Sequence, residues 1–158
     1  MNTANLESLC PCKSRQMYQA CCQPLHQGKL IASSAEQLMC SRYSAFVLKN
    51  SAYLIATLHP SKREHDDDIV LKQTMAQTHW LGLKIIDHYQ QKDTATVEFS
   101  AFFQGDSTIE QHHEKSRFIL EDTHWFYLDG DILPDVKLSR NELCFCGSGK
   151  KVKKCHSG

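Results

Sequence analysis

Eight residues near the two ends of the chain have the types and the spacing of metal ligands. Each set consists of two cysteines one residue apart, then eight residues, then a ligand pair, which is Cys-Cys in the first set and Cys-His in the second. The sets are Cys10, Cys12, Cys21, Cys22 and Cys144, Cys146, Cys155, His156. Thiolate and imidazole are interchangeable ligands of tetrahedral zinc, whereas a disulfide cannot use histidine. The repeat therefore predicts up to two Zn²⁺ ions per chain, with iron–sulfur or redox chemistry as the alternatives.

The residues between the C-terminal ligands fit a tight turn followed by a short helix. Gly147 and Gly149 permit positive φ, and Ser148 can cap the helix that leads to the last two ligands. The N-terminal copy has Lys13 and Arg15 where the C-terminal copy has the two glycines. Side chains rarely adopt positive φ, so we expect the N-terminal turn to be strained or to have a different shape.

Four lysines lie among the C-terminal ligands: Lys150, Lys151, Lys153 and Lys154. One or two of them would offset the net charge of about −1 that three thiolates and an imidazole leave on bound zinc. The surplus predicts a docking patch, with Phe145 as an apolar contact, although a simple solvated charge run is the alternative. A protein partner is favoured over nucleic acid, because the 18 basic and 18 acidic residues of the chain balance and few aromatic residues accompany the lysines.

The two ends of the chain and its hydropathy predict a cytoplasmic protein. The first residues lack a basic start and an apolar core, and no apolar run approaches the roughly 18 residues that span a bilayer. Cytoplasmic thiols stay reduced, which argues against a disulfide framework among the eight cysteines. Cys40 lies in a helical pattern without a partner at ligand spacing, so we expect it in the core.

The segment between the clusters predicts an α+β fold with helices first and strands second. Ser33 and Glu36 fit a capping box for a helix over about 34–49, which Asn50 would end, and apolar periodicity indicates two more helices within 51–60 and 64–77. From Thr78 the period changes to two. Turn-like residues then separate four strands that predict an antiparallel meander: 78–90, 94–104, 109–121 and 124–130. Three helices across such a curved sheet would form a cone.

Longer stretches of the chain resemble known families. CFCGSGKKVKKCH resembles the SEC-C motif, the zinc-binding tail of the translocase ATPase SecA, with Phe145 where that motif usually has proline. CPCKSRQMYQACC resembles a degenerate copy. EQLMCSRYSAFV, YLIATLHP, THWLGLKI, EKSRFI and WFYLDG together resemble the bacterial YchJ family, in which SEC-C motifs flank a nuclear-transport-factor-2-like middle domain.

The resemblance implies three domains: a zinc module at 1–30, a nuclear-transport-factor-2-like (cystatin-like) domain at 31–137 and a second zinc module at 138–158. It also implies a docking role, because in the translocase the SEC-C tail engages a chaperone and the ribosome. Neither the partner nor the oligomeric state follows from it. Since the middle segment has its own apolar pattern, we expect chelation to disorder the two ends and to leave the middle domain folded.

A cone of this type encloses a cup, which supports a second hypothesis of a small-ligand binder or an enzyme. The polar and aromatic candidates for this cup are Arg42, Tyr43, Trp80, His112, Glu114, Arg117 and Asp129. Adjacent strand residues face opposite sides, so we do not expect His112 and His113 to share a metal, while Glu114 and Arg117 are candidates for cross-strand ion pairs. Convergence of Arg42, Glu114 and Asp129 would favour an enzyme. A third hypothesis is binding of RNA or the ribosome through the lysines, but a non-enzymatic zinc protein that docks on a partner protein is favoured.

Overall fold

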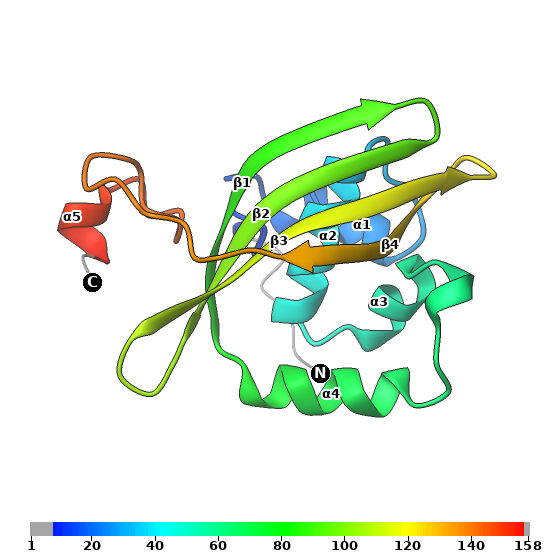
Figure 1. Ribbon diagram of the computed structural model, residues 1–158, viewed down its shortest axis with the longest axis horizontal. Helices are drawn as coiled ribbons and strands as arrows, with labels where there is room; N and C mark the ends of the chain where they lie inside the picture. Colours follow the sequence, from blue (N-terminus) through cyan, green and yellow to red (C-terminus); the bar gives the residue numbers. More distant parts are fainter. Residues whose placement is uncertain (1–7, 157–158) are drawn as a thin grey trace.

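The computed structural model describes residues 8–156, and in this part of the chain helices precede a single four-stranded sheet, which one short helix follows (Figure 1). The sequence start 1–7 and the last two residues, which belong to the predicted zinc modules, lie outside the described residues. The helical elements are η1 (Tyr18–Ala20), α1 (Gln23–His26), α2 (Ala35–Val47), α3 (Ser51–Thr57), η2 (Pro60–Lys62), α4 (Asp67–Gln77) and α5 (Val152–Cys155). The strands are β1 (Trp80–Gln91), β2 (Thr94–Gln104), β3 (Ile109–Glu121) and β4 (His124–Ile132).

The caps of α2 and α3 differ from the predicted ones. The Oγ atom of Ser34, not Ser33, accepts a hydrogen bond from the backbone N–H of Gln37 at 3.1 Å and so caps α2. The side chain of Gln37, not Glu36, reaches back to the backbone N–H of Ser33 at 2.7 Å. Asn50 accepts from the N–H of Tyr53 at 3.1 Å and therefore begins α3, because a carboxamide oxygen is a good helix N-cap.

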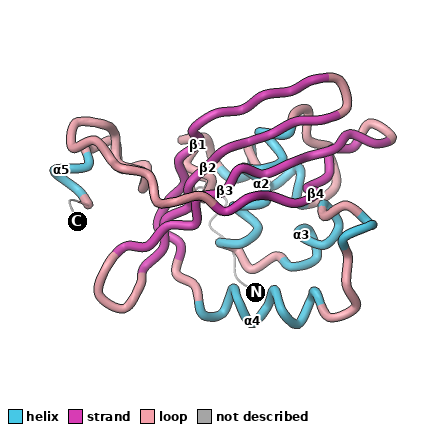
Figure 2. Tube along the Cα trace, in the orientation of Figure 1, coloured by secondary structure: helices cyan, strands magenta, loops and turns pink. Residues whose placement is uncertain are grey.

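The four strands form the predicted antiparallel meander in the order β1-β2-β3-β4. Side chains alternate between the two faces of the sheet, so Phe99 and Ala101 of β2 pack against α2 and the main core while Ser100 and Phe102 face the other way. Figure 2 shows the helices gathered on one side of the sheet and the C-terminal module projecting beyond the strands. The α+β cone is thus the observed fold.

Three groups of buried side chains hold this arrangement together. The main core lies between the sheet and α2 and includes Leu38, Val97 and Phe118. A second cluster joins Phe102 to the C-terminal module, and a third attaches α4 through Met75, which packs against Ala45 of α2 and Leu54 of α3. Cys40 is half-buried and packs against the main core, as predicted. Within residues 8–156, no helix has the length and hydrophobicity needed to cross a membrane.

Candidate metal centres

The C-terminal ligands are held by a tight turn and the short helix α5. The backbone N–H of Cys144 donates to the carbonyl of Lys150 at 2.8 Å, and the N–H of Gly147 donates to the carbonyl of Cys144 at 3.2 Å. Gly147 and Gly149 have φ of 78° and 80°, as their positions in the turn require. Helix α5 then delivers the last two ligands on one side of the turn.

Ser148 does not cap α5, contrary to the prediction. Lys151 occupies the N-cap position of this helix without a side-chain hydrogen bond. The Oγ atom of Ser148 instead accepts from the N–H of Lys150 at 3.2 Å and donates to the sulfur of Cys155 at 3.4 Å. Ser148 therefore holds the turn and contacts a ligand sulfur instead of beginning the helix.

The N-terminal turn repeats this geometry residue for residue. The N–H of Cys10 donates to the carbonyl of Gln16 at 2.7 Å, and the N–H of Lys13 donates to the carbonyl of Cys10 at 3.2 Å. Lys13 and Arg15 have φ of 68° and 69°, in the left-handed region that their glycine counterparts occupy. The turn therefore has the same shape despite the substitutions, and the expected strain is present as two side-chain-bearing residues at positive φ.

The distances within each ligand set fit tetrahedral zinc. All ligand atoms of a set lie within 4.8 Å of one another. The Sγ atoms of Cys12 and Cys21 are 3.6 Å apart, and those of Cys146 and Cys155 are 3.5 Å apart. Tetrahedral zinc with Zn–S bonds of about 2.3 Å places its sulfurs about 3.8 Å apart. A disulfide requires about 2.0 Å, and all the described cysteines are free thiols.

The thiols within each set perturb one another. Burial opposes ionisation of Cys146, but hydrogen bonds from Ser148 and from the Cys155 and Cys144 thiols outweigh it and lower the pKa of Cys146 to about 6. In the N-terminal set, hydrogen bonds from Cys10, Cys22 and Cys40 lower the pKa of Cys12. Cys40 is therefore a fifth thiol beside the N-terminal set, which its isolated position in the sequence did not predict.

The N-terminal set is built into the main core. Cys10, Cys12 and Cys22 are buried there. The hydroxyl of Ser44 in α2 lies 3.3 Å from the sulfur of Cys22 and 3.4 Å from that of Cys10. His26, which follows the set, bonds through Nε2 to the carbonyl of Ser41 at 2.8 Å. The N-terminal end thus shares its core with the middle segment, and its independence of that segment, expected from the sequence, stays a prediction for experiment.

The C-terminal module is attached to the outer face of the sheet, the face opposite the helices. The ring of Phe145 stacks on Phe102 of β2 with a centroid distance of 3.9 Å and an interplanar angle of 8°. Only 5% of Phe145 is exposed. A Cβ atom on Gly82 would lie 2.2 Å from the carbonyl oxygen of Phe145, so glycine is required for this close approach. Phe145 is thus an anchor of the module and not the exposed docking contact that we expected.

Polar residues of β2 and β3 hold the segment that leads to the module. His113 bonds through Nε2 to Glu98 at 2.9 Å and through Nδ1 to the carbonyl of Pro134 at 2.5 Å. The side chain of Gln111 accepts from the N–H of Val136 at 3.0 Å and donates to its carbonyl at 3.1 Å. Sequence reasoning missed these anchors. The only indication of them in the sequence was strand alternation, which places Gln111 and His113 on the face opposite to His112.

The two turns also touch each other. A Cβ atom on Gly147 would lie 3.2 Å from Cδ of Lys13, and one on Gly149 would lie 3.4 Å from an Nη atom of Arg15. The residues that depart from glycine in the N-terminal turn therefore place their side chains against the glycines of the C-terminal turn. This contact joins the two candidate metal centres.

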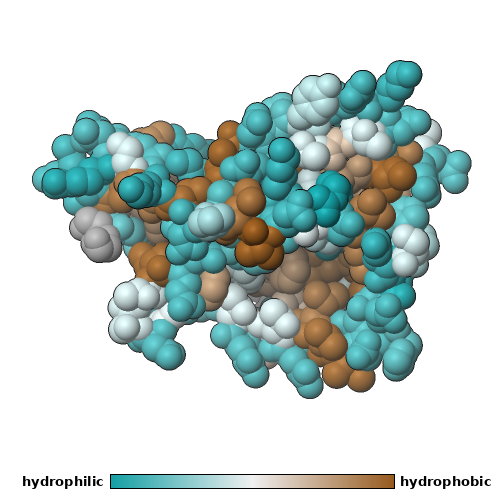
Figure 3. Space-filling view, in the orientation of Figure 1, coloured by the Kyte–Doolittle hydropathy of each residue, from teal (hydrophilic) through white to brown (hydrophobic). Residues whose placement is uncertain are grey.

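The cup is a cavity of about 240 Å³ on the helical side of the sheet. It brings together five of the predicted residues: Arg42, Tyr43, Trp80, His112 and Glu114. Figure 3 shows a recessed hydrophobic hollow between α4 and the sheet, on the helical side of the molecule.

Arg42 and Glu114 of the cup are both held by neighbouring protein groups. Arg42 donates to the carbonyl of Leu54 at 2.8 Å, and its guanidinium lies 4.7 Å from the ring centroid of Tyr127. Burial alone would raise the pKa of Glu114. Hydrogen bonds from His112, Ser116 and Tyr127 outweigh this effect, so the pKa of Glu114 is lowered.

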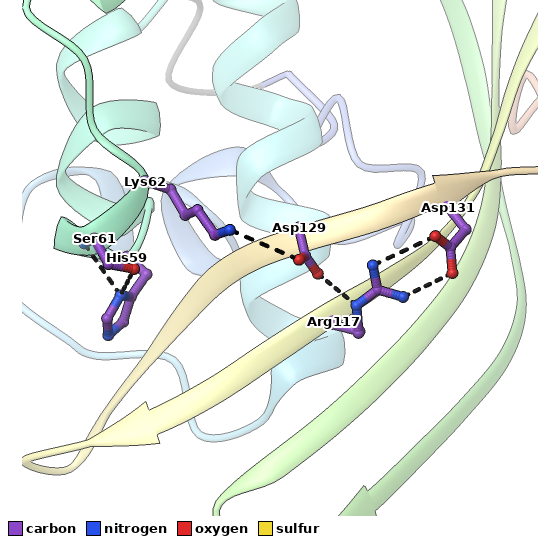
Figure 4. Close-up of polar contacts among 6 residues, drawn as sticks. All are labelled: His59, Ser61, Lys62, Arg117, Asp129 and Asp131. Atoms are coloured by element: carbon purple, nitrogen blue, oxygen red, sulfur yellow. Dashed lines mark hydrogen bonds and ion pairs between the residues drawn. The ribbon is translucent and has the colours of Figure 1, made fainter.

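Arg117 and Asp129 do not face the cup. Figure 4 shows them in an ion-pair network on the surface of β3 and β4, where Arg117 bonds to Asp129 at 2.5 Å and to Asp131 at 2.7 Å. Lys62 approaches the other oxygen of Asp129 at 4.0 Å. The convergence of Arg42, Glu114 and Asp129 that would have favoured an enzyme is therefore not formed.

Comparisons with known proteins agree with this architecture. The family model of the YchJ middle NTF2-like domain matches residues 34–130, and the SEC-C motif matches residues 140–158. A UPF0225 protein of Actinobacillus succinogenes is 40% identical over 95% of this chain and 97% of its own length, and one of Photorhabdus laumondii is 41% identical over 95% and 99%.

Two solved structures of SEC-C motif containing proteins are similar to most of this chain. The solution structure from Rhodopseudomonas palustris has a TM-score of 0.75 and 33% identity over 80% of this chain and all of its own. The crystal structure from Psychrobacter arcticus has a TM-score of 0.70 and 31% identity over 95% of this chain and 96% of its own. Together with the two cysteine-rich sets, which are compatible with metal binding, these similarities identify the chain as a member of the UPF0225 family, with a YchJ-type NTF2-like middle domain and a SEC-C motif.

Proposed function

We propose that this protein binds two structural zinc ions and docks on a partner protein through its C-terminal module. The observation that carries the metal part is the pair of ligand sets, each with four ligand atoms within 4.8 Å and each held by the same backbone hydrogen bonds. Four protein ligands fill the tetrahedral shell of zinc and leave no open position for a substrate. The proposed zinc is therefore structural, and its thiolate ligands suit the reducing conditions of the cytoplasm.

The charge of the C-terminal module supports docking. Segment 140–156 carries five cations, Arg140, Lys150, Lys151, Lys153 and Lys154, and one carboxylate, Glu142. That carboxylate is bound to Lys84 of β1 at 2.6 Å. Within residues 8–156, none of the four lysines forms an ion pair, and three of them are exposed. Such a surplus suits an acidic surface, and by resemblance the partner would be a chaperone, translocation or ribosome-associated protein.

A capture experiment with a charge-matched control tests the docking role. The tagged protein is compared with a variant in which all four lysines of the module are changed to Gln, and bound proteins are identified by mass spectrometry. The control changes four exposed lysines elsewhere, Lys29, Lys49, Lys92 and Lys115, to Gln. We expect the module variant to keep its zinc and lose its partner, the control to keep both, and capture to decline with salt.

Two results would contradict the proposal. Equal capture by the module variant and the control would show that the lysines do not contribute to docking. Loss of capture after nuclease treatment would show that the partner is RNA, as in the third hypothesis from the sequence.

A further inference from the structure

A groove of about 850 Å³ lies between the C-terminal module and the end of the β2–β3 hairpin. Figure 3 shows hydrophobic atoms in the recess between these two parts, at the left of the view. Its walls come from segments far apart in the sequence, namely Phe102–Gln111 of the hairpin, Val136–Arg140 of the connecting segment and Phe145–His156 of the module. The groove therefore exists only when the module is seated on the sheet.

The floor of the groove is apolar and well packed. Phe102, Phe145 and Val152 form it with exposures of 5% or less, and Ile109 and Leu138 are half-buried beside them. The rings of Phe102 and Phe145 stack on each other, so the ring faces in this contact are not free. Bases of single-stranded nucleic acid bind by stacking on free aromatic faces, which this floor does not offer. Apolar side chains of a peptide fit it better.

The rim of the groove is cationic on the side of the module and neutral on the side of the hairpin. The cations Arg140 and Lys153 line the first side beside the candidate metal ligand His156, and Ser107 and Thr108 line the second. No Asp or Glu is among the lining residues. The volume lies near the upper end of the roughly 300–1,000 Å³ that is usual for ligand pockets, which suits several side chains of a peptide.

We infer that this groove receives an extended peptide segment of the partner in which apolar and acidic side chains alternate. Apolar side chains would lie on the floor, and carboxylates would face the cationic rim. The inference rests on the proposed docking function and adds that the hairpin of the middle domain forms half of the docking site. Metal binding at the C-terminal set is needed because the module supplies the other half.

Peptides of defined sequence test the groove directly. The probe is a fluorescein-labelled peptide of alternating Leu and Glu, and the controls alternate Leu with Lys and Ser with Glu. We expect micromolar binding of the Leu-Glu peptide by fluorescence anisotropy, at least tenfold weaker binding of both controls, and loss of binding when a chelator removes the metal.

Two double variants distinguish a role of the groove in docking from a role of the lysine patch, which consists of the four lysines of the module. Ser107→Glu with Thr108→Glu adds negative charge to the rim without touching the module, and both positions are exposed. Gln90→Glu with Gln91→Glu adds the same charge at an exposed site outside the groove. We expect the first pair to weaken binding of the Leu-Glu peptide about tenfold and the second pair to leave it unchanged.

The failures of the two proposals are distinguishable. If the Ser107 and Thr108 variant binds the peptide and captures the partner normally while the four-lysine variant does not, docking stands and the groove is refuted. If the Leu-Glu peptide does not bind, or binds no better than the controls, the groove is likewise refuted. If the four-lysine variant keeps its partner while the hairpin variant loses the peptide, the lysine patch is refuted and the groove stands.

Discussion

Replacing Lys13 and Arg15 by glycine tests whether the two turns support each other. In the C-terminal turn, glycines occupy the two positive-φ positions, whereas in the N-terminal turn these lysine and arginine residues do so at φ of 68° and 69°. Their side chains lie against Gly147 and Gly149. We reason that this contact between the turns offsets part of the cost of holding Lys13 and Arg15 at positive φ. Substitution by glycine removes both the cost of positive φ and the stabilising contact.

The magnitude follows from two opposing effects. A side-chain-bearing residue in the left-handed region costs about 1–2 kcal/mol. Glycine recovers this but loses about 0.5–1 kcal/mol through the greater entropy of the unfolded chain. A site where only φ matters should therefore gain about 0.5–1 kcal/mol. Lys49 and Lys92 are such sites, because they are exposed at φ of 61° and 54°.

The assay is urea denaturation of the metal-saturated protein, combined with the rate of metal release to a chromogenic chelator. We expect Lys49→Gly and Lys92→Gly to stabilise by about 0.5–1 kcal/mol. Lys13→Gly and Arg15→Gly should stabilise less, or destabilise, and should speed metal release from the C-terminal set. If they stabilise as much as the controls and leave the release rate unchanged, the contact between the turns has no energetic role.

Three further predictions concern how the modules are attached. Phe145→Ala removes a buried stacked ring and should loosen the C-terminal module by about 3–5 kcal/mol, seen as faster hydrogen exchange of the Leu83 amide, which bonds to the carbonyl of residue 145. Burial favours neutral His113, but hydrogen bonds to Pro134 and Glu98 outweigh it and raise its pKa. The contribution of His113 to the stability of this attachment should therefore be complete below about pH 6.5 and should disappear as the pH rises through the raised pKa. The amide of Leu133, which bonds to the carbonyl of residue 113, should lose protection from hydrogen exchange over that pH range in the wild type but not in His113→Gln. Because Cys22 is buried in the main core, Cys22→Ser should lower the main thermal transition, whereas Cys155→Ser should leave it in place.

The fold could be predicted from the sequence where one local pattern was decisive. The change of hydrophobic period at Thr78 predicted the sheet, because apolar and polar residues alternate along any strand that buries one of its faces. The helix cap could not be predicted in this way: Ser33 and Ser34 are equally good cap residues by type, and the structure has Ser34 at the cap. The gathering of each candidate ligand set was predictable because its spacing of residue types is one that tetrahedral metal sites use.

The packing of the modules could not be predicted, because it depends on contacts between distant segments. Nothing near Phe145 in the sequence indicates that Phe102 will stack on it, and an aromatic residue in a small cationic module is equally consistent with exposure. The same limit applies to Asp129, which has the right chemistry for the cup but lies on the outer surface with Arg117. Local patterns identify functional groups, while the tertiary fold decides which of them meet.

The most direct test of the central claim is the metal content of the purified protein by native mass spectrometry. The two ligand sets predict two zinc ions per chain, one lost in Cys21→Ser and the other in Cys146→Ser. A single zinc that persists in Cys21→Ser would show that the N-terminal turn, with Lys13 and Arg15 at positive φ, does not hold metal. A protein without zinc, or with iron in its place, would contradict the account.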